Sequence, residues 1–378
     1  AGNVKAVDYD ADAEAIYCVS DGGTLWKGKT DGASWLILNQ NIRCQADILK
    51  LINNGTAQKR ILASFNNNIQ FSDNDGALFT PSTGIEFPVE WGGNYIAGLF
   101  TVNDAEESVY CLTRPWDPDP WSPRFWLYRS IDKGKSFSKI YTFGFGNDNT
   151  VSVTKPVNTN SLIAFEASST AGKASLYNIT GNNVSKSATG NLSATNQPCI
   201  IRAFQKDEQL TLYVLINNKD VYRSLDNGVT WLKRGTLPES SWNMFEISNI
   251  DPNRIFAGGV EAYRSVNGGT NWGKANNWYD YYGNEKTKLH ADIMEIETFR
   301  KKDNTPFLIT CTHGGAYISY NDQASNTNIS LTGHNTGQFY DVLTDQDNTN
   351  YIYGGTQDQG FELPPGATLV ASSDFCPI

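Results

Sequence analysis

The 378-residue chain is poor in charged side chains, and basic ones are the scarcer kind. Only 19% of its residues are charged, with 30 Lys and Arg against 40 Asp and Glu, so the formal net charge is −10. Nucleic-acid binding needs a basic face, so this balance argues against nucleic acid as a partner. No apolar run approaches the roughly 18 residues of a membrane-spanning helix, and we expect no membrane span.

Cysteine and histidine are also rare. The six cysteines form no Cys-x-x-Cys pair, which excludes a zinc knuckle and a thioredoxin-like motif. They are too few for a disulfide scaffold, so we expect buried thiols, with one or two bridges left open. With three histidines and no G-x-S-x-G elbow, a Ser–His or Cys–His mechanism has little support. We read the segment 345–350 as a turn rather than a calcium loop, because it lacks the required Gly and final acid. We therefore expect neither a metal nor a cofactor.

An internal repeat accounts for much of what the sequence does contain. Its clearest copies, Ser130–Phe137 and Ser224–Trp231, both read S-x-D-x-G-x-[ST]-[WF]. Four further copies keep the frame with some positions changed: Ser265–Trp272, Ser72–Phe79, Gly28–Trp35 and Ser319–Asn326. We call these six segments the repeat turns. The segment Ser175–Val184 has a similar hairpin without the motif, and the spacings are roughly 41 to 58 residues, the length of a four-stranded propeller blade.

The residues of the repeat turn suit a tight hairpin. Asp or Asn accepts backbone N–H bonds within the turn, Gly takes the positive φ position, and the aromatic residue packs between blades. Alternating strands flank each copy, in the order strand, turn, strand, turn, strand, repeat turn, strand. The sequence therefore predicts an all-β propeller in one domain over residues 1–378. It has seven blades and a partial eighth, without a repeat turn, over 339–378.

These segments resemble Asp-box repeats, also called bacterial neuraminidase repeats. Such repeats occur in sialidases, two-propeller xyloglucanases, sortilin-type receptors and secreted repeat proteins of Bacteroidetes-like bacteria. The segment Gly354–Gly360 is similar to a motif in large secreted propellers, some of them exported by type IX secretion. The resemblance implies a secreted or cell-surface protein whose native chain continues past Ile378. The chain begins at Ala1, and both removal of a leader and trimming remain open.

Strand order puts the repeat turns on one face and the remaining loops, including the links between blades, on the opposite face. In Asp-box proteins the opposite face usually carries the site. Here its loops are aromatic and acidic, a composition that suits glycan or protein binding as well as simple packing of the loops. The candidate ligand-binding residues are Trp91, Trp116, Asp117, Asp119, Trp121, Arg124, Trp278, Tyr279, Tyr281, Tyr282 and His313.

Two enzyme hypotheses follow from the resemblance. A sialidase needs three clustered arginines and an early Arg-Ile-Pro signature, and the signature is absent. The stretch around Asp21 is similar to the Thr-Asp-x-Gly-Gly segment that holds a catalytic carboxylate in xyloglucanases. Paired with Asp358 in the last segment, Asp21 would suit a glycoside hydrolase. The preferred hypothesis is a binding propeller without catalysis of its own. The alternatives are this hydrolase and a structural module of a large adhesin.

Overall fold

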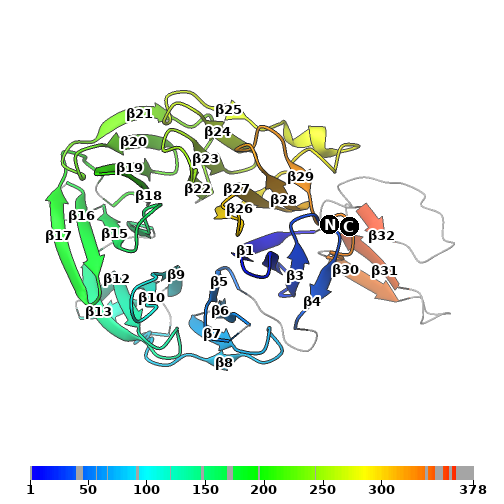
Figure 1. Cartoon of the computed structure of the whole chain (residues 1–378), viewed down its shortest axis with the longest axis horizontal. Helices are drawn as coiled ribbons and strands as arrows, with labels where there is room; N and C mark the ends of the chain where they lie inside the picture. The colour runs from blue at the N-terminus through cyan, green and yellow to red at the C-terminus, as the bar shows by residue number, and fades with distance from the viewer. Residues whose placement is uncertain are drawn as a thin grey trace.

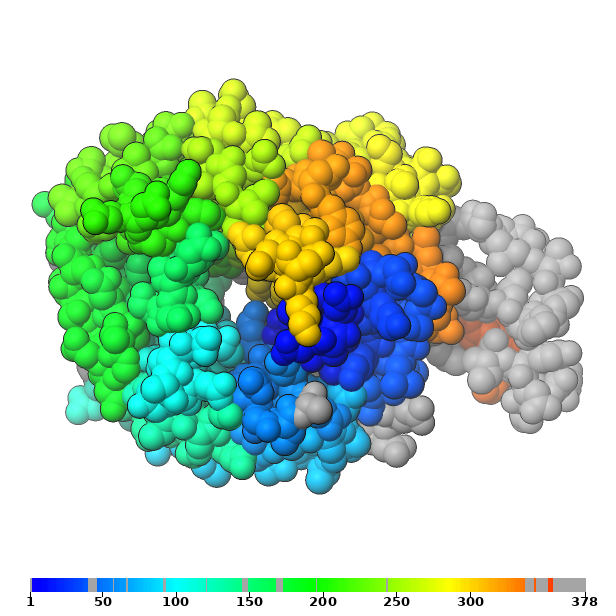
Figure 2. Space-filling model, viewed as in Figure 1, coloured from blue at the N-terminus to red at the C-terminus, as the bar shows by residue number. Residues whose placement is uncertain are grey.

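The computed structural model describes residues 2–39, 46–56, 58–65, 67–90, 93–119, 121–145, 149–167, 173–194, 196–242, 244–336, 339–344, 352–356 and 360–362. Seven antiparallel sheets of four main strands form a ring (Figure 1), which confirms the predicted seven-bladed propeller. Each blade takes its strands from one continuous stretch of chain, and the first strand of each blade is innermost. The space-filling view keeps an opening at the centre of the ring (Figure 2).

The first three blades are built from thirteen strands. Blade 1 contains β1 (Val4–Asp10), β2 (Ala15–Ser20), β3 (Leu25–Lys29) and β4 (Trp35–Ile37). Blade 2 contains β5 (Leu49–Ile52), β6 (Arg60–Phe65), β7 (Asn68–Ser72) and β8 (Thr80–Pro81). Blade 3 contains β9 (Tyr95–Thr101), β10 (Val109–Arg114), β12 (Trp121–Ser130) and β13 (Ser138–Phe145), and β11 (Trp116–Pro118) pairs with the start of β12.

The other four blades follow the same plan. Blade 4 contains β14 (Val151–Thr154), β15 (Leu162–Glu166), β16 (Ser175–Thr180) and β17 (Asn183–Thr189). Blade 5 contains β18 (Cys199–Lys206), β19 (Gln209–Ile216), β20 (Asp220–Ser224) and β21 (Leu232–Thr236). Blade 6 contains β22 (Met244–Ile247), β23 (Ile255–Gly258), β24 (Ala262–Ser265) and β25 (Gly273–Lys274). Blade 7 contains β26 (Ile293–Arg300), β27 (Pro306–Thr312), β28 (Gly315–Ser319) and β29 (Thr327–Asn328).

The predicted partial eighth blade is a three-stranded sheet outside the ring. It comprises β30 (Phe339–Thr344), β31 (Ile352–Thr356) and β32 (Gly360–Glu362). Figure 1 shows it beyond the outer edge of blade 1, because the ring closes between β26 and β1. The one helical segment among the described residues is a 3-10 turn, η1 (Trp278–Tyr281), and no described helix is long and apolar enough to cross a membrane.

The repeat turns fold as their residue types predict. Ser130 Oγ lies 2.6 Å from Asp132 Oδ1 and accepts the N–H of Gly134 at 2.8 Å. Asp132 Oδ1 also accepts the N–H of Ser136 at 2.9 Å, and Gly134 has a φ of +84°. The same bonds recur around Asn74, Asp226, Asn267 and Asn321. The polar groups of these turns are therefore used within the hairpins.

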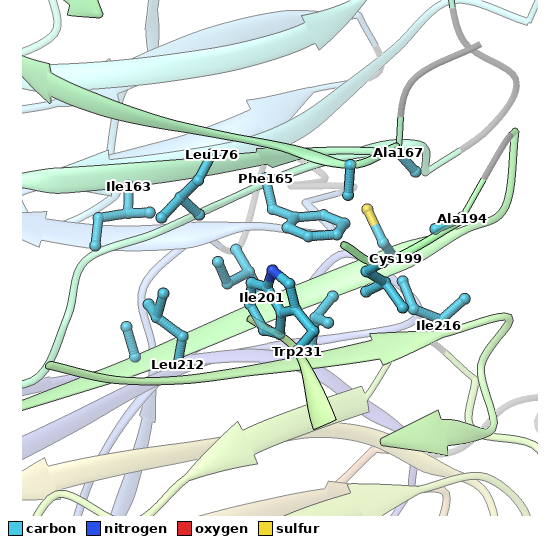
Figure 3. Packing of buried hydrophobic residues seen from close by; sticks show 14 residues of the cluster. Ile163, Phe165, Ala167, Leu176, Ala194, Cys199, Ile201, Leu212, Ile216 and Trp231 are labelled. Carbon is cyan, nitrogen blue, oxygen red and sulfur yellow. The ribbon is translucent and has the colours of Figure 1, made fainter. Parts of the chain in front are cut away.

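Apolar layers between neighbouring blades form the core. Figure 3 shows one of them, where Trp231 from the repeat turn of blade 5 packs against blade 4. Its ring lies edge-on to Phe165 at 5.5 Å, and its indole N–H donates to Gly228 O at 2.9 Å. The repeated aromatic residue thus joins one blade to the previous one, as the sequence predicts.

Side chains of the innermost strands hold the closing seam. Glu295 of β26 accepts the N–H of Val7 in β1, and Asp8 of β1 accepts the N–H of Leu51 in β5, both at 2.6 Å. Lys50 of β5 pairs with Glu297 of β26 at 3.3 Å, across the intervening blade 1. Among the described strands none is exchanged between the first and seventh blades, so the bond from Val7 to Glu295 contributes to closing the ring.

Candidate functional site

Strand direction places the described candidate loops of the ring on one face. In six of the seven blades a repeat turn joins the third and fourth strands, and in blade 4 the hairpin without the motif does so. The turns between second and third strands therefore lie on the other face, with the links between blades. We call this the loop face, and the other the repeat-turn face. On the loop face lie the β2–β3 turn with Asp21, the β11–β12 hairpin, the β25–β26 link with η1, and the β27–β28 turn with His313.

The β11–β12 hairpin of blade 3 carries the first aromatic cluster. Trp116 and Trp121 meet edge to face at 6.1 Å, and the Trp121 side chain is 56% exposed. The N–H of Trp116 donates to Asn94 Oδ1 at 2.9 Å, which ties the hairpin to the link between blades 2 and 3. Asp117 accepts the N–H of Asp119 at 3.0 Å and lies 4.0 Å from Arg124 Nε. The candidate residues of this loop are thus brought together.

A second aromatic cluster follows the link between blades 6 and 7. Trp278 meets both Tyr279 and Tyr282 edge to face, at 5.7 and 6.3 Å. Tyr282 contacts Tyr281 at 5.4 Å, and Tyr281 in turn contacts the buried His290 at 4.6 Å. Trp278 and Tyr279 are 46% and 58% exposed, so the outer rings of this ladder face solvent while His290 anchors it.

The β23–β24 turn connects this ladder to its neighbours. The N–H of Trp278 donates to Glu261 Oε1 at 2.9 Å, and Lys274 pairs with the same carboxylate. On the other side of the turn, the N–H of Trp242 donates to Gly258 O at 2.8 Å, and the Trp242 side chain is 46% exposed. Trp242 was not among the predicted residues, and it is a further exposed aromatic side chain beside the same turn.

His313 is connected to this turn through the carboxylate of Asp292. Its Nδ1 lies 3.1 Å from Asp292 Oδ2, and the N–H of Asp292 donates to Val260 O in the β23–β24 turn at 2.9 Å. Asp292 has a φ of +64°, in the left-handed region that Asp tolerates better than most residues. The His–Asp pair and the aromatic ladder therefore flank one turn.

Of the predicted catalytic pair, only Asp21 is among the described residues. Asp21 lies on the loop face, and its Oδ1 is 2.6 Å from Lys5 Nζ, which also lies 3.4 Å from Asp47 Oδ1. The Lys5 ammonium thus sits between two carboxylates. Asp358 and Trp91 lie outside the described residues. Among the residues that the structure describes, no group of three or more His, Cys, Asp or Glu side chains is placed to hold a metal ion.

Charged side chains of the innermost strands form a feature that the sequence analysis missed. Arg202 Nε of β18 pairs with Glu246 Oε2 of β22 at 2.7 Å, beside the Lys50–Glu297 pair described above. Burial raises the pKa of the Glu246 carboxyl, although the Arg202 guanidinium opposes that shift. The sequence signal for these pairs is a charged residue in the middle of the first strand of a blade.

Comparisons place this chain among propellers by fold. No family model matches the sequence, and no curated protein matches it either. A GH74 enzyme from Niastella koreensis is 14% identical with a TM-score of 0.62, over 97% of this chain and 59% of that one. The GH74 xyloglucanase from Xanthomonas campestris is 14% identical with a TM-score of 0.60, over 94% of this chain and 58% of that one.

A smaller propeller matches over most of its own length. YCF48 bound to D1 peptide is 13% identical with a TM-score of 0.51, over 86% of this chain and 93% of that one. The chain therefore spans less than two thirds of the GH74 structures but nearly the length of YCF48. At these identities the likeness shows the β-propeller fold alone.

Proposed function

We propose that this protein is a secreted or cell-surface propeller that binds glycans through its loop face, without catalysis of its own. The observation that carries the proposal is the exposure of Trp278 and Tyr279, which are in ring contact, together with the exposed Trp242 on the other side of the β23–β24 turn. Aromatic ring faces stack on the C–H-rich faces of sugars, while nearby carboxylates and amides take hydroxyl groups. The repeat turns, which we take as Asp boxes, supply the rigid frame.

Polar side chains beside the rings support this choice. Asn277, in the same link, and the His313–Asp292 pair, on the far side of the turn, are partly exposed, whereas Asn276 and the buried Glu261 are bonded within the protein. A surface that combines solvent-exposed rings with hydrogen-bonding groups suits a hydroxylated ligand better than a purely apolar one.

The test uses neutral soluble polysaccharides, because the net charge of −10 disfavours anionic ones. Xyloglucan comes first, since a GH74 neighbour is a xyloglucanase, followed by mixed-linkage β-glucan and galactomannan. We expect at least one to bind the native protein in titration calorimetry, and Trp278→Ala to weaken that binding at least about tenfold. Tyr320→Ala is the matched control, because Tyr320 is an aromatic residue of similar exposure on the repeat-turn face.

Three results would count against the proposal. Binding of none of the polysaccharides would remove it. Equal weakening by Trp278→Ala and Tyr320→Ala would put the site elsewhere. Release of reducing ends by the native protein, abolished in Asp21→Asn, would replace binding with the hydrolase alternative.

Protein binding is the second candidate function, and one observation favours it. The propeller that this chain matches over 93% of that chain's length, YCF48, is bound to a peptide. The same exposed Trp and Tyr residues would then act as interface hot spots. Capture of a specific protein through the loop face, lost in Trp278→Ala and kept in Tyr320→Ala, would support it over glycan binding.

A further inference from the structure

The loop face carries two separate aromatic clusters. We call them the blade 3 cluster, Trp116 and Trp121, and the blade 6 cluster, Trp242, Trp278 and Tyr279. Both lie on the loop face by strand order, and Figure 1 places blade 3 and the η1 segment on opposite sides of the central opening. No ring contact joins the two clusters among those of the described residues. They are therefore two separate aromatic clusters on one face.

Each cluster by itself offers only a small binding surface. The blade 3 cluster exposes one large ring, Trp121, beside the Asp117 and Arg124 side chains. The blade 6 cluster exposes the rings of Trp242, Trp278 and Tyr279 beside the Asp292–His313 pair. A ring stacks on roughly one sugar, so neither cluster alone covers more than a few units of a chain.

The route between them is polar. The wall of the central opening carries the Arg202–Glu246 and Lys50–Glu297 pairs, together with Asp8 and Glu295. An apolar ligand over this opening would take water away from these charged groups, and their pairing need not offset that desolvation cost. A hydroxylated chain keeps them hydrogen-bonded, directly or through water.

We infer that the two clusters are subsites for one polymeric glycan that runs across the loop face and over the central opening. The inference rests on the proposed function and deepens it, because it names a long polymer rather than a short oligosaccharide as the ligand. Simultaneous engagement of two subsites raises the affinity for a chain that can reach both, because the second contact becomes intramolecular.

The test compares each polysaccharide of the panel above with its own shortest oligosaccharide fragment, by calorimetry on the native protein. We expect the polymer to bind at least about 100-fold more tightly than its fragment. Trp121→Ala and Trp278→Ala should each reduce polymer affinity to near that of the fragment. Each variant should remove only one of the two fragment sites.

Outcomes separate this inference from the function on which it rests. Equal affinity for polymer and fragment, or unchanged polymer affinity in Trp121→Ala, overturns the inference and leaves glycan binding at the blade 6 cluster intact. Failure of every polysaccharide to bind removes the proposed function and the inference with it. Both tryptophans are about half exposed, so unchanged melting temperatures should show that neither variant acts through unfolding.

Discussion

Two tryptophans on opposite faces of the ring have opposite surroundings. Trp231 of a repeat turn is 5% exposed, packs edge-on to Phe165 and donates its indole N–H to Gly228. Trp278 of the loop face is 46% exposed and contacts Tyr279 and Tyr282. The Trp231 ring at the repeat turn therefore serves the fold. On the loop face, exposed rings gather into clusters that the fold does not need, so the loop face is the better candidate for function.

The largest contrast should come from truncating these two tryptophans. Trp231→Ala should lower the free energy of unfolding by about 3–5 kcal/mol, because it opens a cavity between blades 4 and 5. Trp278→Ala should change it by less than about 0.5 kcal/mol while weakening ligand binding. Denaturant titration of both variants checks this, with Trp231→Phe as the control that fills much of the cavity. Equal stability losses would contradict the division between the two faces.

The next contrast concerns two aspartates. Asp132→Ala should cost about 1–3 kcal/mol, because it leaves the donors of one repeat turn without their acceptor, whereas exposed Asp119→Ala on the loop face should cost almost nothing. Asp132→Asn is the matched control, since Asn occupies the same position in other repeat turns. A loss in Asp132→Asn as large as in Asp132→Ala would show that the charge, not the acceptor, matters.

Asp132 also sets an expected pH dependence. Burial opposes ionisation of its carboxyl, but the hydrogen bonds from Ser130, Ser136 and backbone amides outweigh burial, so its pKa lies below the ordinary value. The stabilisation is therefore present above the unfolded pKa of about 4 and is lost as the pH falls through the lower folded pKa. Urea titrations from pH 7 to pH 2 should show the gap between native protein and Asp132→Ala closing only at the acid end.

A glycine pair tests how the loop face is supported. A Cβ on Gly314 would lie 2.4 Å from the Cβ of His290, whereas a Cβ on Gly22, in the equivalent turn of blade 1, would meet nothing within 4 Å. Gly314→Ala should displace His290 and the Tyr281 ring above it, costing about 1–3 kcal/mol and weakening binding at the blade 6 cluster. Gly22→Ala should leave both quantities unchanged. Unaltered ligand affinity in Gly314→Ala would show that the ladder does not position the site.

The smallest effect is expected in the central opening. Burial raises the pKa of Glu295 well above its ordinary value, and the Glu297 carboxylate raises it further. The folded state then binds more protons than the unfolded state above pH 4, so stability falls as the pH rises through this window. Glu295→Gln should reduce that slope and change stability at pH 7 by about 1 kcal/mol or less, since the amide oxygen can still accept the N–H of Val7.

Glu208→Gln serves as the control, because Glu208 is exposed in the β18–β19 turn. It should leave the pH dependence of unfolding unaltered. An unchanged slope in Glu295→Gln as well would mean that Glu295 does not titrate as its surroundings require.

The repeat explains why the fold could be predicted and much of the site could not. Five of the six repeat turns make their key bonds within eight residues, as in Ser130–Phe137, so the local sequence predicts their geometry. The blade 6 cluster depends on three different loops meeting at the β23–β24 turn. The local sequence around Trp242 and Asp292 does not predict these contacts, because their partners, Gly258 and His313, lie in other segments.

The inner-strand charges were overlooked for a different reason. Lys50 and Glu246 stand within short strands that otherwise read as apolar. Only the ring places such residues together, because Lys50 and Glu297 are 247 positions apart in sequence. Charged residues at matching positions in the first strand of successive blades are the pattern that would have indicated them.

Hydrogen exchange of the native protein with and without a bound polysaccharide tests the central claim most directly. The account predicts slower exchange on binding in the segment 239–242, in 278–292 and around Trp121, with no change in the repeat turns Ser130–Phe137 and Ser265–Trp272. Protection confined to the repeat turns would contradict the assignment of function to the loop face.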